Sequence, residues 1–270
     1  MLTDYKHDFS IITIVNKEKV YQDFKKSLNQ QQQVDYEVIK VNNDNNQFKS
    51  ARKAYNEAAK KATGKYLVFI HPDIRFLDKM ALHDILVNTV NIDNFGVVGI
   101  AGSPVRMHKG HFILLTTIKQ GKRKEGIGDP ISDSTEVQTV DECFFIMKKS
   151  YWEQIPFSNI EGWHMYAVEQ CLRAILDGKK NYVIPARVWH LSAGVSEDRN
   201  YVKIGKEIVQ RYGSNFPYIN TTVAHWDTHG MKKNITPWIY YIQNKIMLKV
   251  RDHPNFYQRC RKIKHVFIKP

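Results

Sequence analysis

The sequence predicts an α/β fold in which a mostly parallel sheet is flanked by helices, and two observations support this prediction. The first is the order of elements, because three short apolar runs, at 9–15, 36–41 and 66–70, alternate with two segments of helical spacing. This β-α-β-α-β order is typical of the opening of a doubly wound sheet. The second is the length of 270 residues, which suits one large domain, or one domain with an extension.

Local patterns predict each element of the first half. Residues 9–15 are rich in β-branched side chains, which favour strands. Residues 17–32 carry apolar side chains at spacings of four, which indicates a helix. The strand at 36–41 ends in a turn rich in Asn. The Ala-rich segment 50–62 is expected to be helical and to end before Gly64.

The third strand, 66–70, ends abruptly in His71-Pro72-Asp73. Pro72 cannot continue a central strand because it has no N–H to donate. Asp73 is therefore expected just past the carboxyl end of the strand, where ligands bind in open α/β sheets. A carboxylate beside an imidazole suits a divalent cation that holds a diphosphate. A strand-ending turn with an incidental acid is the alternative.

The second half is less regular. We expect strands at 95–100, 112–118, 140–147 and 182–184, helices at 77–89 and 164–178, and a long loop at 119–136. Loops of that length in compact domains are usually functional, so this one is expected to contribute to binding.

The charge of the chain is concentrated near its C-terminus. The net charge is +13, and residues 231–270 supply +9 of it, with ten Lys or Arg and one Asp. A basic segment on a nearly balanced body indicates an anionic partner. The cysteines, Cys143, Cys171 and Cys260, form neither a metal-ligand pattern nor a disulfide framework. We find no signal peptide and no run that spans a bilayer, so a cytoplasmic location is expected.

Seven segments resemble one known family in their order and spacing. They are 10–16, 41–43, 50–56, 71–73, 140–146, 162–174 and 190–194. Together they resemble the family 2 glycosyltransferases with the GT-A fold, in the branch grouped with the streptomycin-biosynthesis glycosyltransferase-like proteins. The resemblance implies a GT-A (Rossmann-like), mixed and mostly parallel sheet flanked by helices. It also implies transfer of a sugar from a nucleoside-diphosphate sugar.

The resemblance assigns the residues that bind the donor. Asn42 replaces the family's usual Asp, Asn56 matches a recurring Asn, and His71 replaces the first acid of an Asp-x-Asp motif. Core packing is the alternative for Trp163. The donor-binding residues that the resemblance implies are Val15, Asn16, Asn42, Ser50, Lys53, Asn56, His71, Trp163 and His164.

A site for Mn²⁺ or Mg²⁺ is implied as well. Asp73 is the first expected ligand, and His190, which follows a predicted strand at the same sheet edge, is the second. A packed or capping role is the alternative for His190. His71 is either a weak ligand or a hydrogen-bond partner that holds Asp73 in place.

The position of the catalytic base departs from the family. Inverting members carry an Asp at the start of the helix after the acceptor strand, and the matching residue here is Ala167. Either the base has been replaced, or Glu169 serves instead, or the chain binds its ligand without turnover. Positions 167 and 169 lie about 200° apart on a helix, which disfavours Glu169.

Two further acids lie on the predicted strand 140–147. Asp141 and Glu142 are consecutive, so their side chains are expected on opposite faces, and only one of them lines the acceptor pocket. Asp141 matches the family's acidic residue at this place, so we expect it to be the one in the site.

The basic C-terminal segment has the pattern of an amphipathic helix. Thr236 suits an N-cap and Pro237 the first helical position. The apolar stripe that follows is formed by Ile235, Trp238, Ile239, Ile242, Ile246, Met247 and Val250. It is expected to dock on the catalytic domain, on a second subunit in a homodimer, or on an anionic membrane surface.

These observations lead to one interpretation and two rivals. A GT-A domain at 1–225 and a basic helical extension at 226–270 are expected to form an inverting, metal-dependent glycosyltransferase. Its acceptor would be a glycan or lipid-linked molecule in cell-surface polysaccharide synthesis, at the inner face of the membrane. The first rival is a catalytically silent nucleotide-sugar-binding protein. The second is a basic nucleic-acid-binding protein, which is disfavoured because the tail contains no recognisable module.

Overall fold

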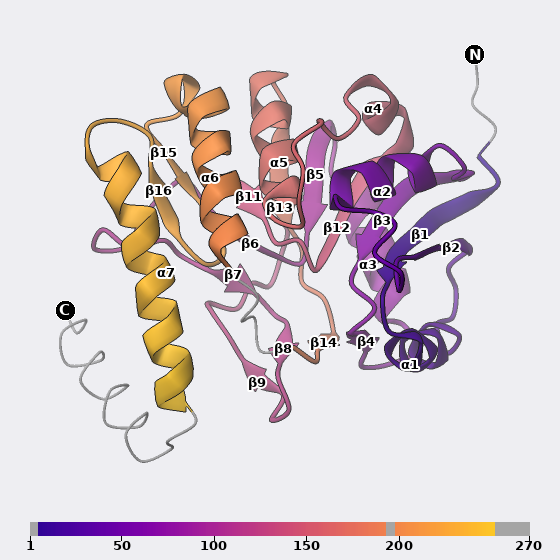
Figure 1. The fold of residues 1–270 in the computed structure, drawn as a ribbon. Helices are drawn as coiled ribbons and strands as arrows, with labels where there is room; N and C mark the ends of the chain where they lie inside the picture. Colours follow the sequence, from indigo (N-terminus) through magenta and orange to yellow (C-terminus); the bar gives the residue numbers. More distant parts are fainter. Residues whose placement is uncertain (1–4, 193–197, 252–270) are drawn as a thin grey trace.

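The computed structural model of the chain describes residues 5–192 and 198–251. Its centre is a seven-stranded sheet (Figure 1). In spatial order the strands are β10 (Thr135–Val137), β13 (Lys180–Val183), β5 (Phe95–Gly99), β12 (Phe144–Lys148), β3 (Gly64–Ile70), β1 (His7–Val15) and β2 (Tyr36–Asn42). Only β12 and β10 run against the other five strands, which confirms the mixed, mostly parallel sheet.

Helices cover both faces of this sheet. On one face, α1 (Glu18–Leu28) and α3 (Ala81–Val90) pack their apolar sides against the strands. On the other face, α2 (Ala51–Ala59), α4 (Lys149–Gln154) and α5 (Tyr166–Leu176) do the same. The predicted helices of the first half are therefore confirmed, with ends that differ from the expected ends by a few residues.

The region from 95 to 148 differs most from expectation. The predicted strand at 112–118 is wrong except for β7 (Leu115–Thr116). The predicted loop at 119–136 contains β8 (Lys119–Gln120), β9 (Glu125–Gly126) and the start of β10. β8 and β9 join a small sheet with β4 (Ile74–Phe76) and β14 (Val188–His190), and β7 joins another with β6 (Ala101–Ser103) and β11 (Thr139–Val140), whereas β10 forms an edge of the main sheet. Pairing with distant segments, rather than local pattern, decides their positions.

The predicted strand at 140–147 is interrupted. It divides into β11 and β12, and residues 141–143 lie in a turn between them. The Oδ1 of Asp141 accepts a hydrogen bond from the Cys143 N–H at 2.9 Å, which stabilises the turn. We call residues Asp141, Glu142 and Cys143 the acid turn.

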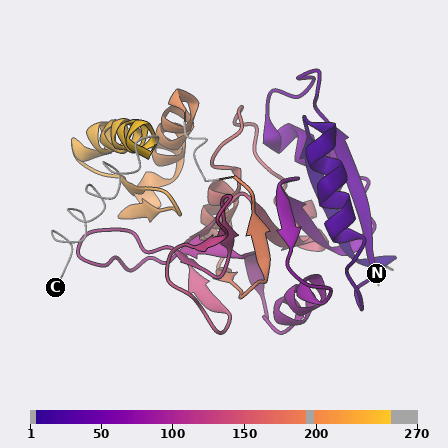
Figure 2. The ribbon, with the colours of Figure 1, turned by 90° about the horizontal axis from the view of Figure 1, so that it is seen from below.

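The C-terminal part packs on the outer end of the molecule. It comprises α6 (Arg199–Tyr212), η1 (Gly213–Asn215), β15 (Tyr218–Asn220), β16 (His225–Asp227) and α7 (Lys232–Arg251). Together α6 and α7 lie on the flank opposite the N-terminal strands (Figure 1, Figure 2). A third apolar cluster joins α6, β15 and β16 to α5, and Trp226 is only 1% exposed within it. The boundary expected between 225 and 226 falls inside β16.

Close approach between α6 and β16 depends on Gly205. A Cβ at this position would lie 2.0 Å from Cη2 of Trp226, so the helix packs its backbone directly against the indole ring.

The last helix begins earlier than expected. α7 starts at Lys232, and Pro237 lies inside it instead of at its first position. The Thr236 hydroxyl donates to Oδ2 of Asp227 at 2.9 Å, which ties this turn to β16. Among the described residues, none of the helices combines the length and the apolar character needed to cross a bilayer. Cys260 and the side chains of Met247 and Val250 lie outside what the structure describes.

Candidate functional site

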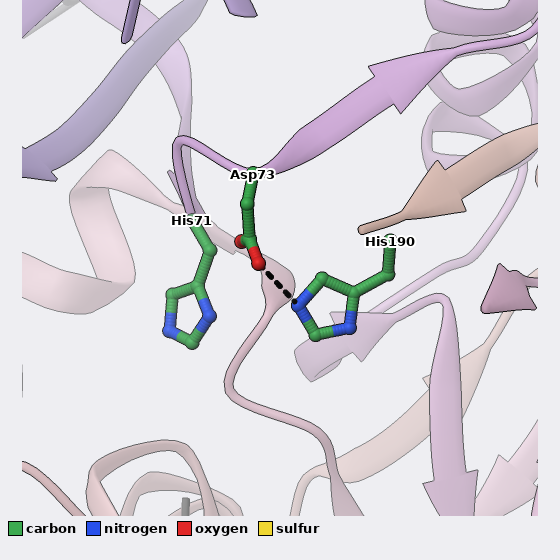
Figure 3. A group of neighbouring side chains, drawn as sticks. All are labelled: His71, Asp73 and His190. Atoms are coloured by element: carbon green, nitrogen blue, oxygen red, sulfur yellow. Dashed lines mark ion pairs between the residues drawn. The ribbon is translucent and has the colours of Figure 1, made fainter. Parts of the chain in front are cut away.

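Three side chains that suit a metal ion meet at the carboxyl end of β3. One ligand atom from each of His71, Asp73 and His190 lies within 4.8 Å of the others. In Figure 3 the Asp73 carboxylate lies between the two imidazole rings. Its Oδ2 is 3.3 Å from Nε2 of His190. We call these three residues the metal cluster.

The backbone explains why residues so far apart in sequence meet. His71 directly follows β3, and Asp73 directly precedes β4. β14 pairs with β4 in antiparallel orientation, with His190 opposite Ile74. The Leu191 N–H then donates to the Asp73 carbonyl at 3.1 Å. The turn at Pro72 thus directs Asp73 back toward the strand that ends in His190.

The charges in the metal cluster favour a carboxylate that stays ionised. Burial alone would raise the pKa of Asp73, but the hydrogen bond and charge of His190, and the charge of His71, lower that pKa to about 2. Burial lowers the pKa of His71. Burial also opposes protonation of His190, yet Asp73 outweighs it and raises the pKa of that imidazole. Asp73 is therefore an anion at neutral pH.

The acid turn faces the same space. Because Asp141 and Glu142 lie in a turn, the expectation that their side chains point to opposite faces of a strand does not hold, and both line the cavity. Oδ2 of Asp141 accepts a hydrogen bond from the Thr222 hydroxyl at 2.6 Å. This bond and the one from the Cys143 N–H overcome the effect of burial, so the pKa of Asp141 is lowered.

Glu142 has the opposite electrostatic character. Its Oε1 accepts a hydrogen bond from the Tyr166 N–H at 2.7 Å, at the start of α5. Burial and the neighbouring charge of Asp141 nevertheless raise the pKa of Glu142 to about 8. One acid of the turn is thus held as an anion, whereas the other exchanges its proton near neutral pH.

A cavity of about 330 Å³ connects the acid turn with the two histidines of the metal cluster. Its walls come from the turn after β3, from β6, β8, β14, the acid turn, α5 and α6, and from the segment after β15. Its polar lining residues are His71, Gln120, Asp141, Glu142, His164, His190, Ser192, Tyr201, Thr221 and Thr222. The volume suits a small ligand that makes several polar contacts.

Ala167 and Glu169, the two positions considered for the catalytic base, do not line this cavity. Ala167 is fully buried, in the apolar cluster under α5. Glu169 is 1% exposed, and its Oε2 lies 2.7 Å from Nε of Arg52. The hydroxyls of Ser158 and Tyr212 also donate to this carboxylate, at 2.8 and 2.9 Å. Glu169 is thus the centre of a buried structural network.

The residues assigned to the donor lie at the neighbouring strand ends. Val15 and Asn42 are register partners at the carboxyl ends of β1 and β2, and Asn16 follows β1. The Ser50 hydroxyl donates to the Ile160 carbonyl at 3.2 Å, which joins the start of α2 to the segment before α5. Lys53 is exposed on α2.

Three other donor-site predictions have distinct surroundings. Asn56 bonds to the backbone N–H and carbonyl of Phe157, so it holds the loop after α4. Trp163 is 39% exposed, not packed in the core. His164 lines the cavity, and its Nε2 is 3.3 Å from Oδ1 of Asp198. Its ring packs edge-to-face on Tyr201 at 5.7 Å.

Sequence reasoning did not identify Tyr166, Tyr201 or Thr222 at this site. The Tyr166 hydroxyl lies 2.9 Å from Nε2 of His71, which links α5 to the metal cluster. Tyr201 lies on α6 and Thr222 follows β15, in a stretch for which no elements were predicted. Only the adjacency of Tyr166 to Ala167 offered a signal in the sequence.

Comparison with known proteins identifies the family of this chain. The sequence profile of a "Glycosyltransferase like family" matches residues 10–212. A protein of Fuscovulum blasticum named "ATP synthase subunits region ORF 6" is 25% identical over 185 residues, which are 65% of this chain and 70% of that protein.

Two solved structures share the fold. S. aureus TarS 1-349, in complex with UDP-GlcNAc, is 17% identical with a TM-score of 0.50, over 75% of this chain and 66% of that one. A second S. aureus TarS structure is 16% identical with a TM-score of 0.52, over 76% of this chain and 39% of that one. The chain thus spans less than two thirds of either structure. The likeness shows a GT-A fold.

Proposed function

Because this chain belongs to the glycosyltransferase-like family, we propose that it is an inverting, metal-dependent transferase of a sugar from a nucleoside-diphosphate sugar. The observation that carries this proposal is the metal cluster, which lies beside a polar cavity at the carboxyl edge of a mostly parallel sheet. That edge is the general ligand site of open α/β sheets.

The metal cluster fits a divalent cation by its donor set. One carboxylate and two imidazoles favour Mn²⁺ over Mg²⁺, which prefers oxygen ligands and retained waters. Asp73 and His190 would hold the ion, with His71 as a third ligand. A cation bound there would supply the Lewis acid that neutralises charge on a departing diphosphate.

The remaining residues divide between donor and acceptor. Val15, Asn16 and Asn42 lie where a base and ribose would bind, beside the start of α2. UDP-GlcNAc bound to TarS supports a nucleotide sugar as the donor. The cavity over the acid turn would receive the acceptor hydroxyl, and His164 would bond the acceptor sugar beside Asp141. A glycan or lipid-linked acceptor in cell-surface polysaccharide synthesis is part of this proposal.

We also propose that α7 lies on an anionic membrane. Its contacts with the body use the side of Thr236, Pro237 and Tyr240. The opposite side carries a stripe formed by Ile235, Trp238, Ile239, Ile242 and Ile246, which are 38% to 56% exposed. Lys232 and Lys245 flank the stripe, as expected for a helix at the boundary between headgroups and acyl chains.

Binding of nucleotides tests the catalytic part of this proposal. A thermal-shift screen of UDP, GDP and dTDP, with and without Mn²⁺, should show one nucleotide that raises Tm only with the metal. Transfer from the matching nucleotide sugar should follow. Metal-dependent binding without transfer from any donor would instead favour the silent nucleotide-sugar-binding protein. A lack of any metal-dependent shift would contradict the proposal.

Co-sedimentation with vesicles tests the membrane part. The variant Ile239→Ser/Ile242→Ser should lose binding to vesicles that contain phosphatidylglycerol, and neutral phosphatidylcholine vesicles should bind the wild type weakly. Val90→Ser is a matched control, since Val90 is an exposed apolar residue on α3, 45% accessible. Equal sedimentation of all three proteins would contradict the membrane proposal.

A further inference from the structure

The expected position of the base leaves a gap in the mechanism. Ala167 has no group that accepts a proton, and its side chain is buried in the apolar cluster of Tyr55 and Phe145. The start of α5 nevertheless has a carboxylate beside it, because Glu142 reaches it from the acid turn and accepts the Tyr166 N–H at 2.7 Å. The backbone N–H of Ala167 also donates a hydrogen bond to the Glu142 carboxylate.

We propose that Glu142 is the general base that accepts the proton of the acceptor hydroxyl. This inference rests on the proposed function. A carboxylate that the family carries on the helix would here be supplied from the neighbouring turn, at the same helix start. Glu142 would then compensate for the missing carboxylate at position 167.

The surroundings of Glu142 suit this role. Its side chain is partly exposed and lines the cavity, whereas Ala167 and Glu169 do not. The Tyr166 hydroxyl lies within 3.4 Å of the Glu142 carbonyl and 2.9 Å of Nε2 of His71. Tyr166 therefore joins the acid turn to the metal cluster, and the base would lie beside the proposed donor diphosphate.

Other carboxylates near the cavity have fixed partners. Both oxygens of Asp141 are engaged, by the Cys143 N–H and the Thr222 hydroxyl. Asp73 is paired with His190. Glu169 is enclosed by Arg52, as described above. Each of these acids has a structural or ligating partner, which leaves Glu142, among the described residues that line the cavity, for proton transfer.

The proposed sugar transfer forms one bond to the anomeric carbon and breaks another. A lone pair of the acceptor oxygen forms the new bond to the anomeric carbon of the donor, and the bond from that carbon to the diphosphate oxygen breaks. The electron pair of the broken bond leaves with the diphosphate. The hydroxyl proton passes to the Glu142 carboxylate, which afterwards returns it to solvent.

The groups around Glu142 determine its proton affinity. Burial and the charge of Asp141 raise its pKa to about 8, whereas Arg52 and the N–H groups at the start of α5 oppose the rise. The phenols of Tyr55 and Tyr166 also face this carboxylate, and burial raises the pKa of both, so they remain neutral. A base whose pKa lies near the working pH is the most effective.

The test compares Glu142→Gln with wild-type holoenzyme at saturating Mn²⁺. The amide oxygen of Gln still accepts the Tyr166 N–H, so the fold and nucleotide binding should be retained. We expect kcat to fall by about 10²- to 10⁴-fold, the usual contribution of a general base. The Mn²⁺-dependent thermal shift with the nucleoside diphosphate should be unchanged. The rise of kcat/KM from pH 6 to pH 8 should disappear.

Glu142→Asp provides a second variant if Glu142→Gln does not fold. It keeps a carboxylate that is one methylene shorter, so activity should fall less and the pH dependence should remain. Glu136→Gln is the matched control, since Glu136 is an exposed acid on β10 paired with Lys180, and it should keep full activity.

Two results would overturn the inference, and they are distinguishable. Wild-type protein that transfers sugar while Glu142→Gln keeps its rate within threefold would exclude Glu142 as the base and leave the proposed function intact. Wild-type protein that transfers no sugar from any donor would overturn the proposed function together with this inference.

Discussion

Two carboxylates of the candidate site, one in the metal cluster and one in the acid turn, have opposite properties. In the metal cluster, Asp73 faces His71 and His190, and its pKa falls to about 2. In the acid turn, Glu142 faces another carboxylate, and its pKa rises to about 8. The difference arises from neighbours, since burial acts in the same direction on both acids.

The comparison shows how one functional group serves two tasks within one site. A carboxylate that stays ionised suits a cation, and one that titrates near neutral pH suits a proton. The four predictions below test this division, from the largest expected effect to the smallest.

Replacing Asp73 should have the largest effect. Asp73→Asn keeps the shape but removes the charge that would bind the cation. We expect kcat/KM to fall about 10³-fold, equivalent to about 4 kcal/mol, and the Mn²⁺-dependent thermal shift to vanish. Asp44→Asn, at an exposed turn position, is the control. Retention of the Mn²⁺-dependent shift in Asp73→Asn would remove this carboxylate from the metal site.

Replacing Glu169 should lower the stability of the fold and should have little effect on ligand binding. Its ion pair with Arg52 is 1% exposed on both sides, so Glu169→Gln leaves a buried guanidinium without its counter-charge. We expect a loss of about 3 kcal/mol in the free energy of unfolding, measured with urea. Glu57→Gln, exposed on α2, is the control. A stable Glu169→Gln with greatly reduced kcat would instead make Glu169 the base.

The difference in stability between Glu142→Gln and the wild type should change with pH, in favour of the variant at high pH. A carboxyl whose pKa is raised on folding stabilises the fold below its unfolded pKa, and this contribution is lost as pH rises toward about 8. The variant and wild type should therefore have similar Tm near pH 4.5. At pH 8.5 the variant should be the more stable of the two, because it has no second negative charge beside Asp141. An unchanged Tm difference between these two pH values would contradict the raised pKa.

Replacing Tyr166 should have the smallest effect. Tyr166→Phe removes the hydrogen bond to His71 but keeps the backbone N–H that Glu142 accepts. We expect a loss of about 1 kcal/mol, seen as a roughly fivefold weaker affinity for Mn²⁺. The control is Tyr36→Phe, whose hydroxyl donates to the Leu28 carbonyl away from the site. A loss as large as that of Asp73→Asn would mean that Tyr166 itself contacts the substrate.

The sequence was sufficient for the parts of the fold that local pattern determines. The runs 9–15, 36–41 and 66–70 became β1, β2 and β3, because buried parallel strands have strong apolar signatures. His71 and Asp73 were placed correctly past β3, because Pro72 ends the strand. The meeting of Asp73 with His190 depended on strand pairing between residues 117 positions apart, and only the family resemblance suggested it.

The acid turn could not be predicted from its own residues. Val140 to Met147 has the apolar composition of one strand, but Val140 pairs with β6 and Phe145 with β5 in another sheet. The chain must turn between the two sheets, so Asp141 and Glu142 leave the alternation of a strand. Tertiary pairing therefore overrides local propensity at the residues where the proposed chemistry occurs.

Gly205 has a consequence for the cavity that it does not touch. Trp226, against which its backbone packs, contacts Tyr201 in a tilted arrangement with ring centroids 5.6 Å apart, and Tyr201 in turn supports His164 at the cavity wall. An added methyl group at 205 would clash with the Trp226 ring, and because this ring is buried, neighbouring side chains would have to shift with it. The absence of a side chain at position 205 would therefore help to determine the width of the cavity, through Trp226, Tyr201 and His164.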